Sequence, residues 1–198
     1  MAAVGLFGGT FNPVHNGHIH LAKEAFSTLK LEKLIFIPAN IPPHKKTYDL
    51  CSNSDRIQMC MLAVEGIKDF EVSDFEMMQG GKSYTYYTVE YFSGLYQNDE
   101  LYLLVGSDMF MIFDSWFRFE DILKKVSLAV VSREYDDMDM LERKAHELQK
   151  YGKIRIIDAE AYPLSSTDIR SIIKENKNYS CYLPEKVVQY IRFNNLYR

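Results

Sequence analysis

The stretch GGTFNPVHNGH, residues 8–18, decides the fold of this chain. It follows an apolar segment at 2–7, which is typical of a strand, and it leads into a helical pattern at 18–25. Adjacent glycines let a backbone approach an anion, and a helix N-terminus offers unpaired N–H groups and the positive end of a dipole. His15 and His18 share one face if both lie in the first helical turn, and would then donate to the same ligand. This order of elements predicts a phosphate site.

Each part of this pattern also fits other interpretations. Glycine pairs punctuate many loops, and two histidines three residues apart fit a chance surface pair or a metal site. Because no Cys or Asp lies nearby in the sequence to complete a metal shell, we expect no protein metal site here.

Length and composition favour one ordinary globular domain. The 198 residues are enough to bury a substantial core, so we expect a single domain over 1–198. The net charge of −4 lacks the basic excess usual in nucleic-acid binders, which argues against that class of partner. No segment approaches the roughly 20 apolar residues of a membrane span, so we expect no membrane partner. Three cysteines without a CxxC pair fit reduced thiols in a cytoplasmic protein.

Apolar runs alternate with amphipathic stretches along the rest of the chain. Further strands are expected at 33–38, 70–76, 101–105, 127–133 and 153–158, and helices at about 54–66, 84–95, 117–125, 139–151, 167–176 and 184–194. This alternation predicts an α/β fold, a doubly wound parallel sheet with helices on both faces. Ligands of such sheets bind outside the carboxyl ends of the strands. The loops expected there are 8–18, 39–46, 106–116, 163–170 and the one from 133 onward.

A second polar motif, LSSTDIR at 164–170, opens one of the expected helices. Ser165 as N-cap and Asp168 at the third helical position fit a capping box. A helix N-terminus rich in hydroxyls and followed by Arg170 also fits an anion site. The two interpretations are compatible, and the residues alone leave both open.

Taken together, these motifs resemble those of a known superfamily. GGTFNPVHNGH is similar to the GGTFDPxHxGH signature of nucleotidyltransferases with HxGH active sites, with Asn12 where many members carry Asp. SSTDIR is similar to their ISSTxIR motif, with Leu164 in the usual place of Ile. The resemblance implies a Rossmann-like fold and binding of the ATP phosphates between the two motifs.

Further segments resemble one branch of this superfamily, the bacterial nicotinate-nucleotide adenylyltransferases. IPPHK at 41–45, KSYT at 82–85 and GSDMFMIFDSW at 106–116 are similar to its PPHK, PSYT and G-x-D…W segments. Two departures stand out: Lys82 replaces the usual Pro, and Ser-Arg-Glu at 132–134 replaces Arg-Pro or Arg-Arg-Pro.

The resemblance implies transfer of AMP from ATP to nicotinate mononucleotide, which yields deamido-NAD and pyrophosphate in NAD biosynthesis. The attacking group is already a phosphate oxygen, so the expected mechanism is direct in-line attack without a covalent enzyme intermediate. By resemblance, His18 donates to the α-phosphate, His15 and Arg170 hold the other phosphates, and Lys45 reduces repulsion between the two substrates. Mg²⁺ is expected to be bound with ATP and to use few protein ligands.

The expected substrate contacts fall into two sets. For ATP they are His15, His18, Gly8, Gly9, Thr10, Phe11, Gly106, Asp108, Ser166, Thr167, Ile169 and Arg170, with Asp108 at a ribose hydroxyl. For nicotinate mononucleotide they are Lys45, Ser83, Tyr84, Thr85, Trp116 and Arg133. Trp116 is expected to stack on the pyridine ring, although a packed structural tryptophan also fits. Backbone N–H groups near Thr85 are expected to bind the substrate carboxylate.

Three other functions stay open at this stage. A pantetheine-phosphate adenylyltransferase shares both phosphate motifs but is typically shorter and lacks the PPHK and SYT segments. A cytidylyltransferase usually ends in a different serine-threonine motif. A non-catalytic nucleotide-binding regulatory module is the third, against which the intact His15, His18, Lys45 and Arg170 argue. The sequence is also compatible with a homo-oligomer.

Overall fold

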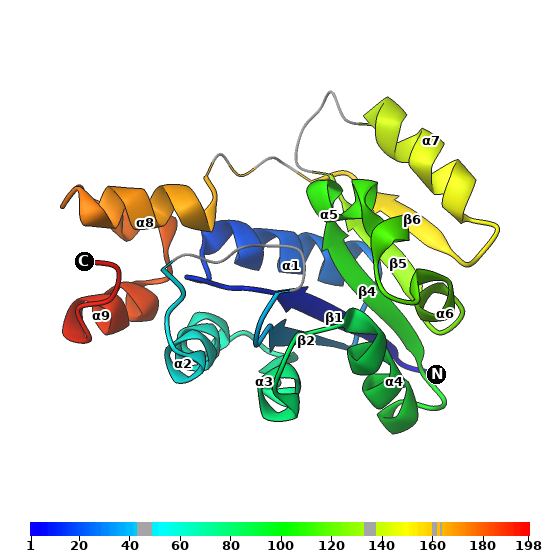
Figure 1. The fold of residues 1–198 in the computed structure, drawn as a ribbon, viewed down its shortest axis with the longest axis horizontal. Helices are drawn as coiled ribbons and strands as arrows, with labels where there is room; N and C mark the ends of the chain where they lie inside the picture. Colours follow the sequence, from blue (N-terminus) through cyan, green and yellow to red (C-terminus); the bar gives the residue numbers. More distant parts are fainter. Residues whose placement is uncertain (43–48, 133–137, 160–161, 163) are drawn as a thin grey trace.

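The strands of the computed structural model form one parallel sheet in the order β3-β2-β1-β4-β5-β6 (Figure 1). The structure describes residues 1–42, 49–132, 138–159, 162 and 164–198. The strands are β1 (Ala3–Gly9), β2 (Lys33–Pro38), β3 (Phe70–Val72), β4 (Glu100–Gly106), β5 (Ser127–Val131) and β6 (Ile154–Ile157). This order confirms the doubly wound α/β fold that the sequence predicts.

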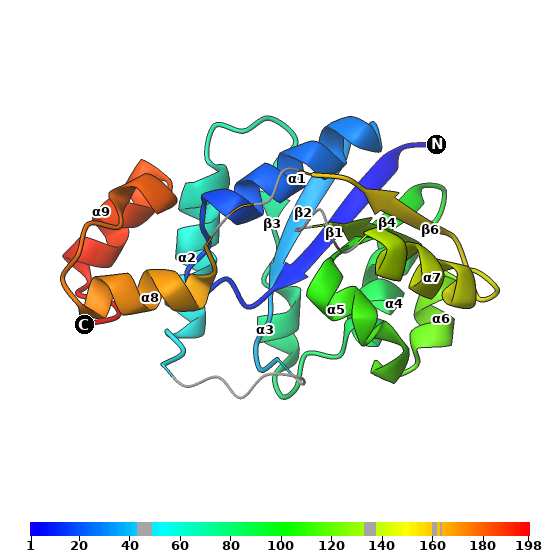
Figure 2. The same cartoon turned by 90° about the horizontal axis from the view of Figure 1, so that it is seen from above.

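Helices follow most of the strands and cover both faces of the sheet (Figure 2). They are α1 (Asn16–Thr28), α2 (Asn53–Val64), α3 (Phe75–Gln79), α4 (Thr85–Leu95), α5 (Ser107–Met111), α6 (Phe119–Leu123), α7 (Met138–Leu148), α8 (Ser166–Lys174) and α9 (Glu185–Phe193). Short 3₁₀ turns lie at η1 (Phe113–Ser115) and η3 (Ser180–Tyr182). None of these described helices is long and apolar enough to cross a membrane.

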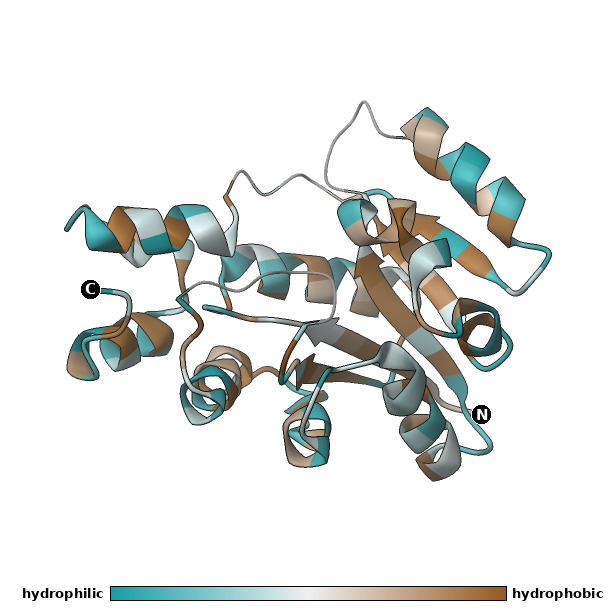
Figure 3. Ribbon diagram, in the orientation of Figure 1, coloured by the Kyte–Doolittle hydropathy of each residue, from teal (hydrophilic) through white to brown (hydrophobic). Residues whose placement is uncertain are grey.

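The strands supply two hydrophobic cores because successive side chains point to opposite faces. Leu6 and Leu103 pack on one face with side chains of α4 to α7. Phe7 and Leu104 pack on the other face with side chains of α1, α2, α8 and α9. The central strands are accordingly coloured as hydrophobic between more polar helices (Figure 3). Buried on both faces, they read in sequence as continuous apolar runs, as expected for parallel strands.

The expected strand at 70–76 is wrong beyond Val72. β3 pairs with β2 over only three residues, and Ser73 Oγ then accepts a hydrogen bond from the Phe75 N–H at 3.3 Å. That side-chain contact begins α3, because serine offers the backbone a turn in competition with a ladder. The alternating pattern of 70–76 therefore spans a short edge strand and the first turn of a helix.

Side-chain contacts settle two details of the helices α2 and α4. α2 has Ser52 as its N-cap, with the Ser52 hydroxyl accepting the Asp55 N–H at 3.1 Å. On α4, Phe92 is buried, but Tyr91 and Leu95, which the helical spacing places with it, are 44% and 59% exposed. Tyr91 instead stacks on the ring of Phe75 in α3, with 4.0 Å between the ring centroids.

The sheet order places the point at which the connections change direction between β1 and β4. These strands are neighbours, and the chain leaves β1 towards β2 but leaves β4 towards β5. Where connections diverge in this way, the two following helices move apart and a ligand can sit between them. Gly8, Gly9 and Gly106 occupy the last positions of these two strands.

Candidate active site

The N-terminal loop, residues 8–18, runs from the end of β1 to the first turn of α1. A Cβ on Gly8 would meet no atom within 4 Å, so the space above this residue is open to a ligand. A Cβ on Gly9 would lie 2.8 Å from the ring of Phe11, which explains why this position lacks a side chain. The Phe11 ring itself is buried, 1% exposed, with a φ of 46°. Only the backbone of Phe11 is therefore available for the predicted contact with ATP.

His15 and His18 meet at the N-terminus of α1, as the spacing predicts. His15 is the N-cap, and its backbone N–H donates to Nδ1 of His18 at 3.2 Å. A neutral imidazole that accepts at Nδ1 carries its proton on Nε2, so His18 presents Nε2 as a donor. The two ring centroids are 3.7 Å apart, and the edge of Phe11 supports His18 at 5.0 Å. The loop thus fixes both the position and the tautomer of His18.

The capping box predicted at the start of α8 is confirmed. The Asp168 carboxylate accepts hydrogen bonds from the Ser165 N–H at 2.8 Å and from the Ser165 hydroxyl at 2.6 Å. These two contacts hold the pKa of Asp168 below its ordinary value of 3.8. The cap satisfies N–H groups of the first turn of α8 that have no intrahelical partner.

Side chains of α8 bind the N-terminal loop directly. The Ser166 hydroxyl donates to the Pro13 carbonyl at 2.9 Å, and Arg170 donates to the Asn12 carbonyl at 2.8 Å. Arg170 also donates to the Thr167 hydroxyl at 3.3 Å. Although Arg170 and Asn12 are 158 residues apart in sequence, the fold brings the two predicted phosphate motifs together. The buried Ile169 side chain, in contrast, packs in the core beneath α8.

Asn12 departs from the family signature, and its contacts show what the amide does. Its Nδ2 donates to the Asp49 carbonyl at 2.9 Å. Its Oδ1 accepts from the Cys51 N–H at 3.1 Å and from the Tyr197 hydroxyl at 2.8 Å. An ionised aspartate accepts hydrogen bonds only, so it could not make the contact with Asp49. In this chain the amide ties the N-terminal loop to the segment before α2 and to the C-terminus.

Residues predicted for the second substrate lie at the start of α4 and after η1. Thr85 is the first residue of α4, and the Tyr84 ring lies 5.2 Å from the ring of Phe117. This contact places Trp116, the neighbour of Phe117, near the N-terminus of α4. Trp116 also packs on Phe113, with 4.9 Å between the ring centroids. This contact fits the alternative interpretation, in which Trp116 is a packed structural residue. Its stacking on a pyridine ring stays a prediction.

Ser83 has a structural partner that the sequence analysis did not anticipate. Its hydroxyl accepts the Asn40 N–H at 2.8 Å, and its own N–H donates to the Ile41 carbonyl. These contacts join the segment before α4 to the loop that follows β2. Lys82, the departure from the usual Pro, forms a bridge with Ile41 in the same place.

Of the remaining predicted site residues, the structure describes Asp108 but not Lys45 or Arg133. Asp108 is exposed in the first turn of α5, the helix that directly follows Gly106 at the end of β4. Lys45 and Arg133, together with Glu134 in the second departure, lie outside the described residues.

Arg56, a fully buried arginine of α2, is a functional candidate that was not predicted from the sequence. It donates hydrogen bonds to Thr10, the residue after β1, and to Ala39, the residue after β2. A signal was present in the sequence: Arg56 lies three and four residues before Met59 and Cys60, on the buried stripe of the helix.

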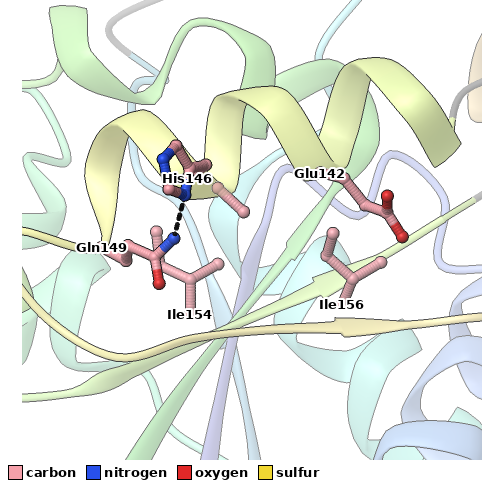
Figure 4. Close-up of a pocket in the computed structure, with 6 residues that line it drawn as sticks. Glu142, His146, Gln149, Ile154 and Ile156 are labelled. Carbon is pink, nitrogen blue, oxygen red and sulfur yellow. Dashed lines mark hydrogen bonds between the residues drawn. The ribbon is translucent and has the colours of Figure 1, made fainter.

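An open pocket lies elsewhere in the molecule, between α7 and β6 (Figure 4). It is lined by Glu142, Ala145, His146, Gln149, Ile154 and Ile156. The figure shows His146 and Gln149 joined by a hydrogen bond, which is 2.9 Å long. None of the residues predicted to bind substrate lines this pocket.

Comparisons with known proteins agree with the fold and the motifs. The family model described as Cytidylyltransferase-like matches residues 6–172, so the chain belongs to the Cytidylyltransferase-like class of proteins. A relative from Carboxydothermus hydrogenoformans, described as "Probable nicotinate-nucleotide adenylyltransferase", is 42% identical over 100% of this chain and 98% of its own. A Clostridium tetani relative with the same description is 40% identical over 98% of each chain. The chain belongs to the nicotinate-nucleotide adenylyltransferase family.

Solved structures resemble the fold over the whole chain. The Plasmodium falciparum nicotinic acid mononucleotide adenylyltransferase complexed with NaAD has a TM-score of 0.81 at 17% identity, covering 100% of this chain and 98% of its own. A structure of a nicotinate-nucleotide adenylyltransferase from Vibrio parahaemolyticus has a TM-score of 0.69 at 18% identity, covering 100% and 96%. At these identities the likeness supports the Rossmann-like α/β fold.

Proposed function

We propose that this enzyme transfers AMP from ATP to nicotinate mononucleotide and releases pyrophosphate. The observation that carries the proposal is the contact of α8 with the N-terminal loop, through Ser166 to Pro13 and Arg170 to Asn12. It brings together two helix N-termini and the side chains of His15, His18 and Arg170 near the carboxyl end of β1. Such a site suits a triphosphate. The names of the full-length relatives support the choice of reaction and of second substrate.

In the proposed reaction, a phosphate oxygen of nicotinate mononucleotide attacks the α-phosphorus of ATP and pyrophosphate leaves in line. Charge builds on the α-phosphate oxygens as the new bond forms. Nε2–H of His18 is the donor that we assign to those oxygens, since its tautomer is set by the hydrogen bond at Nδ1. We assign His15 and Arg170 to the remaining phosphates and Lys45 to the charge between the two substrates. No side chain needs to act as a base.

The proposed ATP site extends from Gly8 and Gly9 to Gly106 and Asp108. The open space above Gly8 leaves room for phosphate, and the carboxylate of Asp108 suits a ribose hydroxyl. The residues of α8 complete the contacts through their backbone and hydroxyl groups.

The donor set of this site also bears on the expected magnesium ion. Imidazole, guanidinium and N–H groups predominate around the N-terminal loop. Such a set fits an ion held mainly by the ATP phosphates, as Mg²⁺ commonly is. When bound, Mg²⁺ would neutralise part of the phosphate charge.

The second substrate is assigned to the start of α4. Backbone N–H groups in the first turn of a helix have no intrahelical partner, so those at Thr85 and Tyr86 suit the carboxylate of nicotinate. Trp116, held near this turn through Phe117 and Tyr84, suits the face of the pyridine ring. The similar Plasmodium falciparum structure is complexed with NaAD, which supports a dinucleotide product.

A substrate panel tests the proposal. In three reactions the protein is incubated with Mg²⁺, ATP and one of nicotinate mononucleotide, nicotinamide mononucleotide or phosphopantetheine. In a fourth, CTP and an alcohol phosphate replace ATP and these substrates. The release of pyrophosphate is followed in each. We expect the fastest release with nicotinate mononucleotide. Release only with phosphopantetheine would replace the proposed function with that of the pantetheine enzyme. If none of these substrates leads to release of pyrophosphate, a regulatory nucleotide-binding protein would be favoured.

A further inference from the structure

Arg56 uses its whole side chain to bind the backbone near the candidate site. Its Nε donates to the Cys51 carbonyl, one Nη donates to the carbonyls of Thr10 and Ala39, and the other donates to the Asn40 carbonyl and the Asn53 side chain. Guanidinium has five N–H donors, and these contacts engage all five. The side chain is 0% exposed, although arginine is rarely buried without a carboxylate.

The acceptors of Arg56 come from three separate segments of the chain. Thr10, whose carbonyl lies 2.9 Å away, belongs to the N-terminal loop. Ala39 and Asn40 follow β2, and Asn40 accepts at 3.2 Å. Asn53, which begins α2, accepts at 2.6 Å. One buried group therefore connects the ends of β1 and β2 to the helix that lies beneath them.

The same contacts continue to the segment that precedes α4. Asn53 Nδ2 donates to Asn40 Oδ1 at 2.6 Å, and the Asn40 N–H donates to the Ser83 hydroxyl at 2.8 Å. Asn40 Nδ2 donates to the Gly81 carbonyl at 2.8 Å. Through Asn40, Arg56 is connected to both regions that the proposed function assigns to substrates.

We infer that Arg56 is a positioning residue that fixes the N-terminal loop relative to the loop after β2 and the start of α4. The inference rests on the proposed function, in which those regions hold the two reacting phosphates. In-line transfer depends on the separation of the two substrates, and a misplacement of about 1 Å can cost about 10²-fold in rate. The geometry of the guanidinium, rather than its charge alone, supplies this constraint. Lysine presents three donors from a single atom and cannot reach all three segments.

The test compares Arg56→Lys with Asn53→Ala and with Met59→Ala as a matched control. Met59 is equally buried on the same helix but belongs to the hydrophobic core, so its loss lowers the unfolding temperature without touching the polar contacts. We expect Arg56→Lys to lower kcat by about 10²-fold, with much smaller changes in either KM. Asn53→Ala should lower kcat less. Met59→Ala should leave kcat near the wild-type value at temperatures where it is folded.

Hydrogen exchange of the same proteins gives a second readout that needs no turnover. In Arg56→Lys and Asn53→Ala, the backbone amides of residues 8–12 and 39–41 should exchange faster than in Met59→Ala at equal global stability. Unchanged exchange in these segments, or a wild-type kcat in Arg56→Lys, would overturn the inference. An inactive wild-type protein would instead overturn the proposed function, while the exchange measurement would still test Arg56. If Arg56→Lys does not fold, the kcat and the hydrogen exchange of Asn53→Ala test the inference in its place, and wild-type values of both would overturn it.

Discussion

His18 has a single chemical task in the proposed reaction. The N–H of His15 holds its Nδ1, which leaves Nε2 as a donor. We predict that His18→Ala lowers kcat by about 10²- to 10³-fold, the usual loss for one donor aimed at developing charge. His20→Ala, on the same helix, is the control. Steady-state kinetics with thermal unfolding of both variants checks this: similar turnover in wild type and His18→Ala would remove His18 from the reaction.

Glu76 introduces a pH dependence of stability. It is buried in α3, where it accepts the Thr88 hydroxyl at 2.6 Å, and burial raises its pKa above the ordinary 4.5. Because the folded protein holds this proton more tightly than the unfolded chain, the contribution of Glu76 is most favourable below about pH 4.5 and is lost as the pH rises through the folded pKa.

Glu76→Gln tests this dependence, since glutamine keeps an acceptor for Thr88 without the charge. The unfolding temperature of the variant relative to wild type should increase as the pH rises above about 4.5 and through the raised pKa of Glu76. A difference that stays constant over this range would show that Glu76 does not titrate as described.

Arg56 and Asn12 show where single residues escape prediction from sequence. Arginine is usually a surface residue, and its acceptors here are backbone carbonyls of segments that meet only in the folded chain. Asn12 likewise contacts Asp49 and Tyr197, which no local pattern relates to it. In contrast, His15 and His18 could be paired in advance because their contact is local to one helical turn.

At the scale of elements, α8 is held by its capping box and serves the site through Arg170. We predict that Ser165→Ala destabilises the protein by about 1 kcal/mol, a typical cost for a lost N-cap. It should also raise KM for ATP, because the first turn of α8 then binds the N-terminal loop less firmly. Denaturant unfolding and ATP-dependent kinetics measure the two effects. Stability loss with an unchanged KM would limit the cap to a structural role.

Element types were predictable from continuous apolar runs, whereas the alternating pattern at 70–76 was misleading. The parallel strands β1, β2, β4 and β5 are apolar runs bounded by turn residues, and all lie where they were expected. The pattern at 70–76 has the period of a strand over seven residues, yet only 70–72 pair with β2. A side-chain hydrogen bond from Phe75 N–H to Ser73 redirected the chain, and hydrophobic periodicity does not register such a contact.

For the molecule as a whole, the site joins the two ends of the sequence. α8 lies beside the N-terminal loop beyond one end of the sheet (Figure 1), and Arg170 and Tyr197 both contact Asn12 of that loop. In the proposed function, α4 and Trp116 contribute from the middle of the chain. The doubly wound parallel sheet could be predicted from strand-helix alternation, and with it the carboxyl ends of the strands as the place where the candidate site lies. The buried contacts that set their separation could not be, since they depend on side chains from distant segments.

This division of the site predicts separable substrate effects. Trp116→Ala should raise KM for nicotinate mononucleotide much more than KM for ATP, because Trp116 is assigned to the pyridine ring alone. Its packing on Phe113 predicts a loss of stability as well, so kinetics should be measured well below the unfolding temperature. Equal effects on both KM values would exclude the stacking role.

The central claim is transfer of the adenylyl group (AMP) of ATP to nicotinate mononucleotide. The most direct test is a reaction of the wild-type protein with Mg²⁺, nicotinate mononucleotide and ATP labelled at the α-phosphate, with the products separated and identified by mass. We predict that the label appears in deamido-NAD and that unlabelled pyrophosphate forms in equal amount. Label that remains in ATP or appears only in AMP would contradict the account.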